Sequence, residues 1–489
     1  MKLIRTIGIT LIALLVCSGV AITQEPFTAG HWTRVAVNPP TGVSHIQLLT
    51  DGSVLALNSG CHLTGNWFRL VPDSTGSYIH GKWVSGGTLP AGYNPLYFAS
   101  AVLPSGNLIL MGGEYDGCNA VWSTKGAFYS VRTNHWSVVT APLGWTTIGD
   151  AQSVVLPTGK FMLANCCTKE EAIASISGTT VTWTPTGTGK ADVNDEEGWT
   201  LLPSGNVLTV DANNTANLKN SEKYTTSTGT WASAGSTMVQ LDDTSTATNS
   251  HELGPMVLRP NGTVIAAGAT TNNAVYNIAT HTWSAAPKFG GNLDAADAPA
   301  ALLPDGNVLF DTSPGIFKTG TKFFEWDGAA FNPVPGPPNA SADSSYYGSM
   351  VVLPTGQILF TDFSSDVEVY TPSGSPCTGC APFITSVASS LSHGSFNNVV
   401  TGHRFNGMSE GASYGDDSQS ATNFPLVRIK DALGKVVYCR THGFSVGVAT
   451  GTKSVSTQFD IPSTISLGPA TLKVVANGIA SPGVAITIN

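Results

Sequence analysis

The sequence predicts an all-β protein, and three observations lead to this expectation. Gly (53 residues) and Pro (29 residues) are abundant in the chain of 489, whereas only 11% of the residues are charged. No long stretch repeats its apolar residues with a helical spacing. A motif of two short apolar runs around a Pro-x-Gly turn recurs along the chain, and this motif is typical of a tight β-hairpin.

The hairpin motif is clearest at residues 351–360, where Pro354-Thr355-Gly356 forms the turn. Six other copies have their turn glycines at Gly52, Gly106, Gly159, Gly205, Gly262 and Gly306, and the seven glycines are 44 to 57 residues apart. An aromatic residue in a short strand follows each of the first six turns: Trp83, Trp136, Trp183, Trp231, Trp283 and Phe331. A period of about fifty residues in a β-rich chain predicts a seven-bladed β-propeller of the kelch type.

The two ends of the repeat region complement each other. The seventh unit ends near Pro372 without an outer aromatic strand, and Trp32 lies in a β-like segment near the start of the chain. We expect this N-terminal strand, near residues 30–37, to complete the last blade and close the ring, because closure removes exposed strand edges. An open repeat array is the alternative.

The first residues resemble a secretory signal peptide, which we expect to span residues 1–21. Lys2 and Arg5 precede a short apolar run that is too short for a membrane span, and small residues follow. Cys17 leaves a lipoprotein alternative open. The formal net charge of −9 becomes −11 without Lys2 and Arg5, and no Lys/Arg cluster occurs. We therefore expect a secreted protein, extracellular or periplasmic and monomeric, without a nucleic-acid partner.

The propeller is expected over residues 22–372, followed by a linker at 373–382. Short β segments recur in residues 383–489 and predict an immunoglobulin-like (early-set) β-sandwich. The cysteines of an exported chain favour disulfides over zinc sites. The candidate disulfides are Cys61 with Cys118, the adjacent Cys166 with Cys167, and Cys377 with Cys380. Pairing of Cys166 and Cys167 elsewhere, or not at all, is the alternative.

Acidic and aromatic residues recur six to eight positions before the turn prolines. In a propeller these positions ring the mouth of the central channel. They are Tyr97, Asp150, Glu196, Glu197, Glu252, Asp297, Tyr346 and Tyr347, with His251 beside Glu252. Because gathered carboxylates repel one another, they favour a cation, a proton or a hydrogen-bonding ligand. The sequence therefore predicts a funnel that binds a metal ion or a polyhydroxylated ligand. The alternative is that the carboxylates cap backbone N–H groups of neighbouring blades.

The signal peptide, the kelch-like repeats and the C-terminal domain together resemble the galactose oxidase and glyoxal oxidase group of copper-radical oxidases. In the C-terminal domain the resemblance is carried by residues 414–417, 423–428 and 440–442. It implies a copper ion held by two tyrosines and two histidines, with one tyrosine cross-linked to a cysteine. Tyr97 and Tyr346 match the tyrosines, and Thr441-His442 resembles the segment that carries one histidine.

Two parts of that copper site are replaced in this sequence. Tyr347 stands where the family has a histidine, and Val43 stands where it has the cross-linking cysteine. His45 is expected one step deeper on the face of the strand that carries Val43. A site of Tyr97, Tyr346, Tyr347 and His442 is rich in oxygen, so a metal bound there need not be copper.

We therefore expect a protein that binds extracellular carbohydrate or another small polar ligand in the funnel, without copper-radical catalysis and with no required cofactor. One alternative is an oxidase of alcohols, aldehydes or sugars that uses copper or another divalent metal ion. Another is an adhesion or matrix interaction protein.

Overall fold

The structure, a computed structural model, describes residues 27–59, 65–244, 251–415 and 419–489. In these residues almost all regular structure is β-strand, and the one helical element is a 3₁₀ turn, η1, at Ser345–Tyr347. No helix in the described ranges is long and apolar enough to cross a membrane. The all-β prediction is confirmed. The predicted signal peptide, Cys17 and Cys61 lie outside the described residues.

Seven antiparallel sheets in the described residues repeat one pattern of four paired strands, and we number them sheet 1 to sheet 7. Sheet 1 contains β2 (Val43–Leu48), β3 (Val54–Asn58), β4 (Asn66–Val71) and β5 (Lys82–Thr88). Sheet 2 contains β7 (Ala99–Val102), β8 (Leu108–Met111), β11 (Gly126–Ser130) and β12 (His135–Val139). Sheet 3 contains β13 (Ser153–Val155), β14 (Phe161–Ala164), β15 (Glu171–Ser177) and β16 (Thr180–Thr186). Sheet 4 contains β17 (Thr200–Leu201), β18 (Val207–Val210), β19 (Asn220–Thr225) and β20 (Thr230–Ser236). Sheet 5 contains β21 (Leu253–Leu258), β22 (Thr263–Gly268), β23 (Asn273–Asn277) and β24 (Thr282–Ala286).

Sheets 6 and 7 each include a strand from a distant part of the chain. Sheet 6 contains β25 (Ala300–Leu302), β26 (Val308–Thr312), β27 (Lys322–Trp326) and β28 (Phe331–Val334), extended by β35 (Ala412–Ser413). Sheet 7 contains β29 (Ser349–Val352), β30 (Ile358–Thr361), β31 (Glu368–Thr371) and the N-terminal β1 (His31–Arg34). A small sheet of β6 (Pro95–Leu96), β9 (Tyr115–Asp116) and β10 (Asn119–Ala120) accompanies sheet 2.

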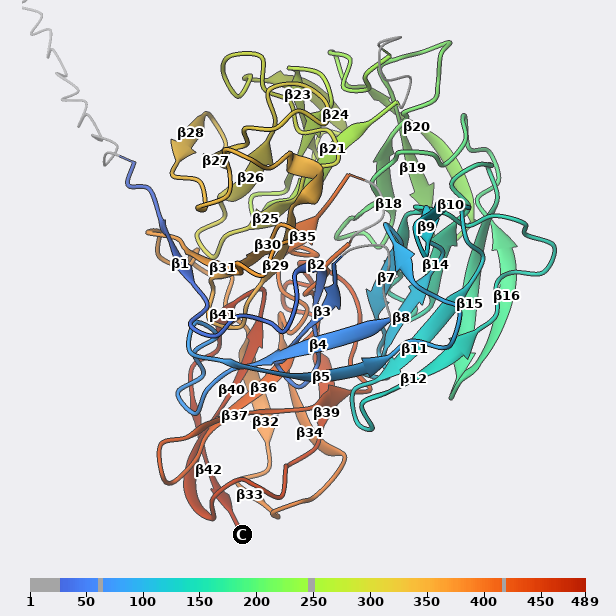
Figure 1. The fold of residues 1–489 in the computed structure, drawn as a ribbon. Helices are drawn as coiled ribbons and strands as arrows, with labels where there is room; N and C mark the ends of the chain where they lie inside the picture. Colours follow the sequence, from blue (N-terminus) through green and yellow to red (C-terminus); the bar gives the residue numbers. More distant parts are fainter. Residues whose placement is uncertain (1–26, 60–64, 245–250, 416–418) are drawn as a thin grey trace, which may run out of the picture.

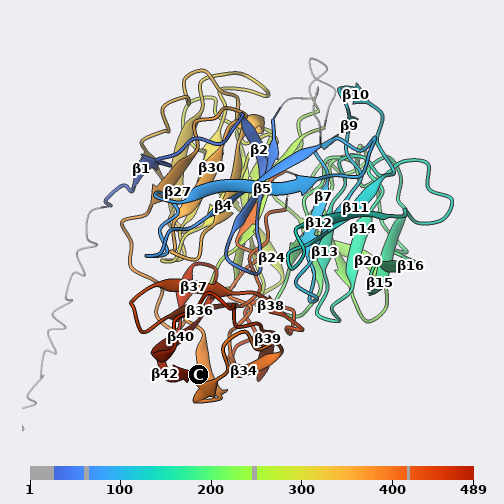
Figure 2. The same cartoon turned by 60° about the horizontal axis from the view of Figure 1, so that its bottom comes forward.

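The first strands of the sheets lie innermost and contact one another. Strand β2 packs on β29, β7 on β13, β17 on β21, β21 on β25, and β25 on β29. In Figures 1 and 2 the sheets follow one another around a common centre. This arrangement is that of a β-propeller.

Each Pro-x-Gly turn closes the hairpin between the first two strands of a sheet. In sheet 7 the Leu353 N–H donates to the Gln357 carbonyl at 2.8 Å, and the Gly356 N–H donates to the Leu353 carbonyl at 2.9 Å. Gly356 has φ of 83°, in the left-handed region where glycine has no steric penalty. The turn therefore fixes where each inner strand ends, and hence which residues lie at its start.

The N-terminal strand β1 pairs antiparallel with β31, with Trp32 opposite Tyr370. The Trp32 ring packs on Phe323, Phe360 and Tyr370 at centroid distances of 4.9 to 5.6 Å. Its indole N–H donates to the Pro335 carbonyl at 2.6 Å. This strand therefore joins the beginning of the described chain to the last propeller sheet.

Two further sheets form a C-terminal β-sandwich that begins at Phe383. One contains β32 (Phe383–Val387), β34 (Asn398–His403), β39 (Val455–Phe459) and β38 (Thr441–His442). The other contains β33 (Ser390–Leu391), β42 (Val484–Ile488), β40 (Gly468–Ala476), β36 (Leu426–Lys430) and β37 (Val436–Cys439), with β41 (Ile479–Ala480) beside β40. Val400 and Phe459 from the first sheet share one core with Ile429, Leu472 and Ile486 from the second. In Figure 1 the sandwich, orange to red, lies below the propeller.

One segment between β34 and β36 leaves the sandwich and enters the propeller. We call residues 410–415 and 419–423 the channel segment. Its strand β35 pairs with β25, the Glu410 carboxylate accepts the Leu201 N–H at 2.8 Å, and the Ser420 hydroxyl donates to the Ile46 carbonyl at 2.7 Å. The segment thus contacts inner strands of sheets 1, 4 and 6, and β35 lies among the propeller sheets in Figure 1. Residues 416–418 lie outside the described residues.

Candidate functional site

A cavity of about 360 Å³ lies at the starts of the inner strands, at the ends opposite the Pro-x-Gly turns. Its lining residues are Tyr97, Glu114, Tyr115, Asp150, Glu196, Glu252, Asp297, Phe317, Tyr346 and Tyr414. The structure therefore brings together six of the predicted residues: Tyr97, Asp150, Glu196, Glu252, Asp297 and Tyr346. Sequence reasoning missed Glu114, Tyr115, Phe317 and Tyr414.

The backbone turns sharply where these residues enter the cavity. Tyr97 has φ of 52°, Glu196 has 59° and Asp297 has 45°, while Gly149 before Asp150 has 71°. The left-handed region costs a non-glycine residue about 1–2 kcal/mol, because its Cβ crowds the following carbonyl. Such conformations persist where the surrounding structure holds them, and they gather at functional sites. Their recurrence around one cavity favours a site that is shaped for a ligand.

Three carboxylates converge on one side of the cavity. Glu196, Glu252 and Asp297 each place a carboxylate oxygen within 4.8 Å of the other two. Glu252 is only 3% exposed, and its Oε2 has no hydrogen-bond partner among the described residues. The described lining includes no Lys, Arg or His side chain. A ligand or ion that relieves this negative charge would therefore gain most of its binding energy here.

Burial and the negative charge of the cavity also raise the pKa values of two neighbouring carboxyl groups. Burial raises the pKa of Glu114 to about 7, and the charges of Glu252 and Asp195 add to that shift. Burial likewise raises the pKa of Asp195 to about 6, with a further contribution from Glu252. These carboxyl groups therefore titrate close to neutral pH, where they can act as hydrogen-bond donors or acceptors.

Aromatic rings line the remaining walls of the cavity. Tyr97 and Tyr414 are stacked, with centroids 6.3 Å apart and planes 24° apart. Phe317 meets Tyr346 edge to face at 5.1 Å. The negative faces of such rings attract weakly positive C–H groups, so the cavity combines apolar faces with strong hydrogen-bond acceptors.

Three other predicted residues do not line the cavity. Glu197 is fully buried and accepts from Lys190 Nζ at 2.8 Å. His251 turns its Nδ1 towards Asp242 Oδ1 at 3.4 Å, and Tyr347 packs on Phe363 at 5.4 Å. The expectation that these side chains face the funnel is therefore incorrect. For Glu197 the reason is the bend at Glu196, whose φ of 59° turns the two neighbouring side chains in different directions.

His442 lies far from the cavity tyrosines. Its Nε2 is 3.0 Å from Asp460 Oδ1, and the next residue, Gly443, donates its N–H to the Pro104 carbonyl at 2.6 Å. Pro104 is in the turn after β7, whereas Tyr97 precedes β7, and an extended stretch of this length spans about 20 Å. The predicted grouping of His442 with Tyr97 and Tyr346 is therefore wrong. The sandwich docks on the turn side of the propeller, and the channel segment, not β38, reaches the cavity.

The donor set does not fit a copper-radical centre. Val43 is buried in β2 where the family has its cysteine. His45 is also buried, edge-on to Phe98 at 4.8 Å, and burial lowers its pKa to about 3. Within the described part of the chain, the cavity lining supplies tyrosines and carboxylates but no imidazole. We derive no copper-dependent step for this site.

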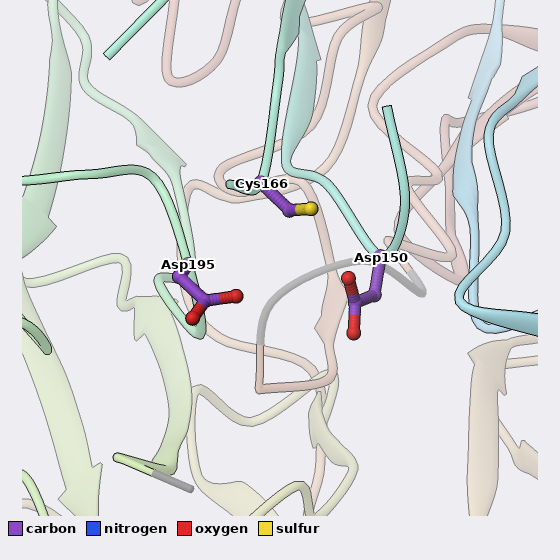
Figure 3. Close-up of side chains that lie close together, drawn as sticks. All are labelled: Asp150, Cys166 and Asp195. Atoms are coloured by element: carbon purple, nitrogen blue, oxygen red, sulfur yellow. The ribbon is translucent and has the colours of Figure 1, made fainter. Parts of the chain in front are cut away.

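The described cysteines lie at four places, and one of them, Cys439 in β37, is buried and free. Cys166 is bonded to Cys167 and Cys377 to Cys380, and Cys118 is in a disulfide, although its predicted partner Cys61 lies outside the described residues. Figure 3 shows Cys166 beside the carboxylates of Asp150 and Asp195, and ligand atoms of the three lie within 4.8 Å of one another. The Cys166–Cys167 disulfide therefore borders the acidic cavity through Asp150.

A larger cavity of about 830 Å³ lies where the sandwich meets the propeller. Some of its charged lining residues form ion pairs: Arg440 lies 3.2 Å from Asp460, and Asp51 pairs with Arg69, which is not among the lining residues. Arg132 stacks over the Phe396 ring at 4.9 Å. The Arg132–Phe396 contact joins the propeller to the sandwich, so this cavity belongs to the contact region between the two domains, and we take the smaller acidic cavity as the candidate for ligand binding.

The chain matches no protein-family model and no curated protein. Among solved structures it is similar to a fungal alcohol oxidase of the AA5 family in complex with copper, at 12% identity and a TM-score of 0.49, covering 94% of this chain and 99% of that chain. A streptogramin B lyase matches at 11% identity and a TM-score of 0.49, covering 71% of this chain and 98% of that chain. A virginiamycin B lyase from Staphylococcus aureus matches at 10% identity and a TM-score of 0.47, covering 70% of this chain and 99% of that chain. At TM-scores this low, the likenesses carry no conclusion about this chain, and the site is interpreted from its own geometry.

Proposed function

We propose that this is a secreted protein whose propeller cavity binds a neutral carbohydrate or a similar small polyol, without copper-radical catalysis. The observation that carries this proposal is the meeting of Asp150, Glu196, Glu252 and Asp297 with the stacked Tyr97 and Tyr414 in one cavity. Carboxylate oxygens accept hydrogen bonds from sugar hydroxyls, and the tyrosine rings offer flat surfaces for the C–H face of a sugar ring.

The size and charge of the cavity limit the kinds of ligand that it can bind. A volume of about 360 Å³ is near the lower end of the range for small-molecule sites, so one or two sugar rings fill it. Acidic sugars are disfavoured, because their carboxylates meet Glu114, Asp150, Glu196, Glu252 and Asp297. Neutral or cationic polyhydroxylated ligands fit the same surface.

The architecture that we propose for this protein is a closed, seven-bladed kelch-type propeller followed by an immunoglobulin-like sandwich. The seven described four-stranded sheets and the pairing of β1 with β31 support the ring. The two sheets that share the core of the sandwich support the second domain. The signal-peptide character of residues 1–21 supports secretion, and the low content of Lys and Arg supports the absence of a nucleic-acid partner. We propose a monomer.

Binding to an array of neutral and acidic glycans, followed by calorimetry with each hit, tests the proposal. We expect binding of neutral glycans, and a loss of tenfold or more in affinity for Tyr97→Ala and for Asp150→Asn. The exposed Glu170 lies outside the cavity, so Glu170→Gln is the matched control and should bind as the wild type does. Equal binding by all three variants, or hydrogen peroxide release on alcohols or sugars by the purified protein, would refute the proposal.

A further inference from the structure

The three converging carboxylates come from three neighbouring sheets. Glu196 precedes β17, Glu252 precedes β21 and Asp297 precedes β25, and these inner strands pack on one another. One oxygen from each carboxylate lies within 4.8 Å of the other two. The trio is therefore assembled by the packing of sheets 4, 5 and 6 and not by a single flexible loop.

Glu252 is the residue of this trio whose surroundings point to a bound ion. The residue is only 3% exposed, and among the described residues no hydrogen-bond donor reaches Oε2. A buried carboxylate oxygen without a donor costs free energy unless a proton or a cation occupies the space beside it. Oε2 itself is shielded from solvent, but Glu252 lines the cavity, so a cation that enters the cavity lies beside this carboxylate.

A second acidic trio in the same chain shows how this protein neutralises buried carboxylates elsewhere. Asp192, Glu197 and Asp211 also place oxygens within 4.8 Å of one another. There the Lys190 ammonium lies 2.7 Å from Asp192 and 2.8 Å from Glu197, and these carboxylates hold the pKa of Lys190 well above its ordinary value. No lysine, arginine or histidine lines the described wall of the cavity around Glu252.

We propose that Glu196, Glu252 and Asp297 bind one calcium ion in the propeller cavity. The donors are all oxygens, which hard divalent cations prefer. Calcium takes about six to eight oxygen ligands at about 2.3–2.6 Å in a flexible geometry, whereas magnesium at about 2.0–2.1 Å demands a near-ideal octahedron. Three carboxylates held by three separate sheets suit the flexible calcium geometry better. Water or ligand hydroxyls from the open side of the cavity complete the coordination. The calcium site goes beyond carbohydrate binding and forms without a sugar.

Metal titration of the purified full-length protein, first stripped with a chelator, tests this proposal. Terbium luminescence, sensitised by the cavity tyrosines, and calorimetry with calcium alone should both give one site per chain. Calcium should raise the melting temperature and displace terbium. Glu252→Gln should weaken calcium binding at least tenfold and abolish the calcium-dependent rise in melting temperature.

Asp211→Asn is the matched control, because it alters the trio that Lys190 already neutralises, and it should bind calcium as the wild type does. If Glu252→Gln does not fold, Glu196→Gln should show the same loss of calcium affinity. The absence of stoichiometric calcium binding, unchanged affinity in a folded Glu252→Gln variant, or equal affinity for magnesium would overturn the calcium assignment. Because no sugar is present in these titrations, a negative glycan array with a positive calcium titration would refute the proposed function alone.

Discussion

The phenolic hydroxyl of Tyr414 donates a hydrogen bond to the backbone carbonyl of Tyr346 at 2.9 Å. Tyr346 lies in η1 just before sheet 7 of the propeller, whereas Tyr414 belongs to the channel segment that the C-terminal domain inserts. The same tyrosine stacks on Tyr97 of the propeller. Both domains therefore build the wall of the cavity, and a change in the sandwich can alter the site without touching the propeller sheets.

Two substitutions of Tyr414 distinguish the contribution of its hydroxyl hydrogen bond from the contribution of its aromatic ring. Tyr414→Phe removes only the bond to Tyr346 and should lower the free energy of unfolding by about 1 kcal/mol, with sugar affinity nearly unchanged. Tyr414→Ala also removes the surface stacked on Tyr97 and should weaken sugar binding roughly tenfold, or by about 1.4 kcal/mol. Urea denaturation and calorimetry measure the two effects. Equal sugar affinity in both variants would show that the ring does not contact the ligand.

Lys190, in the connection between sheets 3 and 4, lies at the centre of a buried ion cluster that includes Glu222 of β19. Its side chain is fully buried, and Nζ contacts Asp192, Glu197 and Glu222 at 2.7 to 2.8 Å. Lys190→Met leaves three buried carboxylates without their cation and should cost roughly 3–5 kcal/mol in the free energy of unfolding. Chemical denaturation checks this, with the exposed Lys160→Met as the control that should change little. A Lys190→Met protein as stable as wild type would mean that these carboxylates are neutral in the folded state.

Stability should fall as the pH rises through the range in which Glu114 and Asp195 titrate. Both carboxyl groups bind a proton more tightly in the folded protein, with pKa values of about 7 and about 6, than at their model values of 4.5 and 3.8. Their contribution to stability is therefore full below those model values and is lost as the pH passes the folded values.

Melting temperatures in calcium-free buffer between pH 5 and pH 8 measure this effect. We expect Glu114→Gln to flatten the decline, because its amide does not ionise, whereas the exposed control Glu170→Gln should keep the wild-type slope. A slope that is the same in Glu114→Gln as in the wild type would contradict the assignment of this titration to Glu114.

The N-terminal strand should contribute to the stability of the propeller. Trp32 in β1 packs on three aromatic rings and is half-buried. Trp32→Ala should lower the free energy of unfolding by roughly 2–3 kcal/mol, less than for a fully buried tryptophan. Val37, which is 54% exposed, provides the control Val37→Ala, expected to be nearly neutral. Denaturation curves that coincide for Trp32→Ala and wild type would show that β1 is not held in sheet 7.

Much of the candidate site could be predicted because it depends on local sequence. The Pro354-Thr355-Gly356 turn and its copies fix where each inner strand ends, so counting back finds the residues at the strand starts. That counting placed Tyr97, Asp150 and Asp297 at one mouth, and the structure brings them together. It could not separate Glu196 from Glu197, because the bend at Glu196, with φ of 59°, decides which of the two neighbours faces the cavity.

The all-β class, the repeated hairpins and most of the acidic ring can be predicted from the sequence, because they follow from turn chemistry and strand spacing. Which distant segment enters the propeller depends instead on how the two domains dock. The sandwich docks on the turn side, where Gly443 bonds to Pro104, so His442 is held away from the cavity while Tyr414 is carried into it. Docking of this kind depends on contacts between residues hundreds of positions apart, such as Ser420 with Ile46, and no local pattern encodes them.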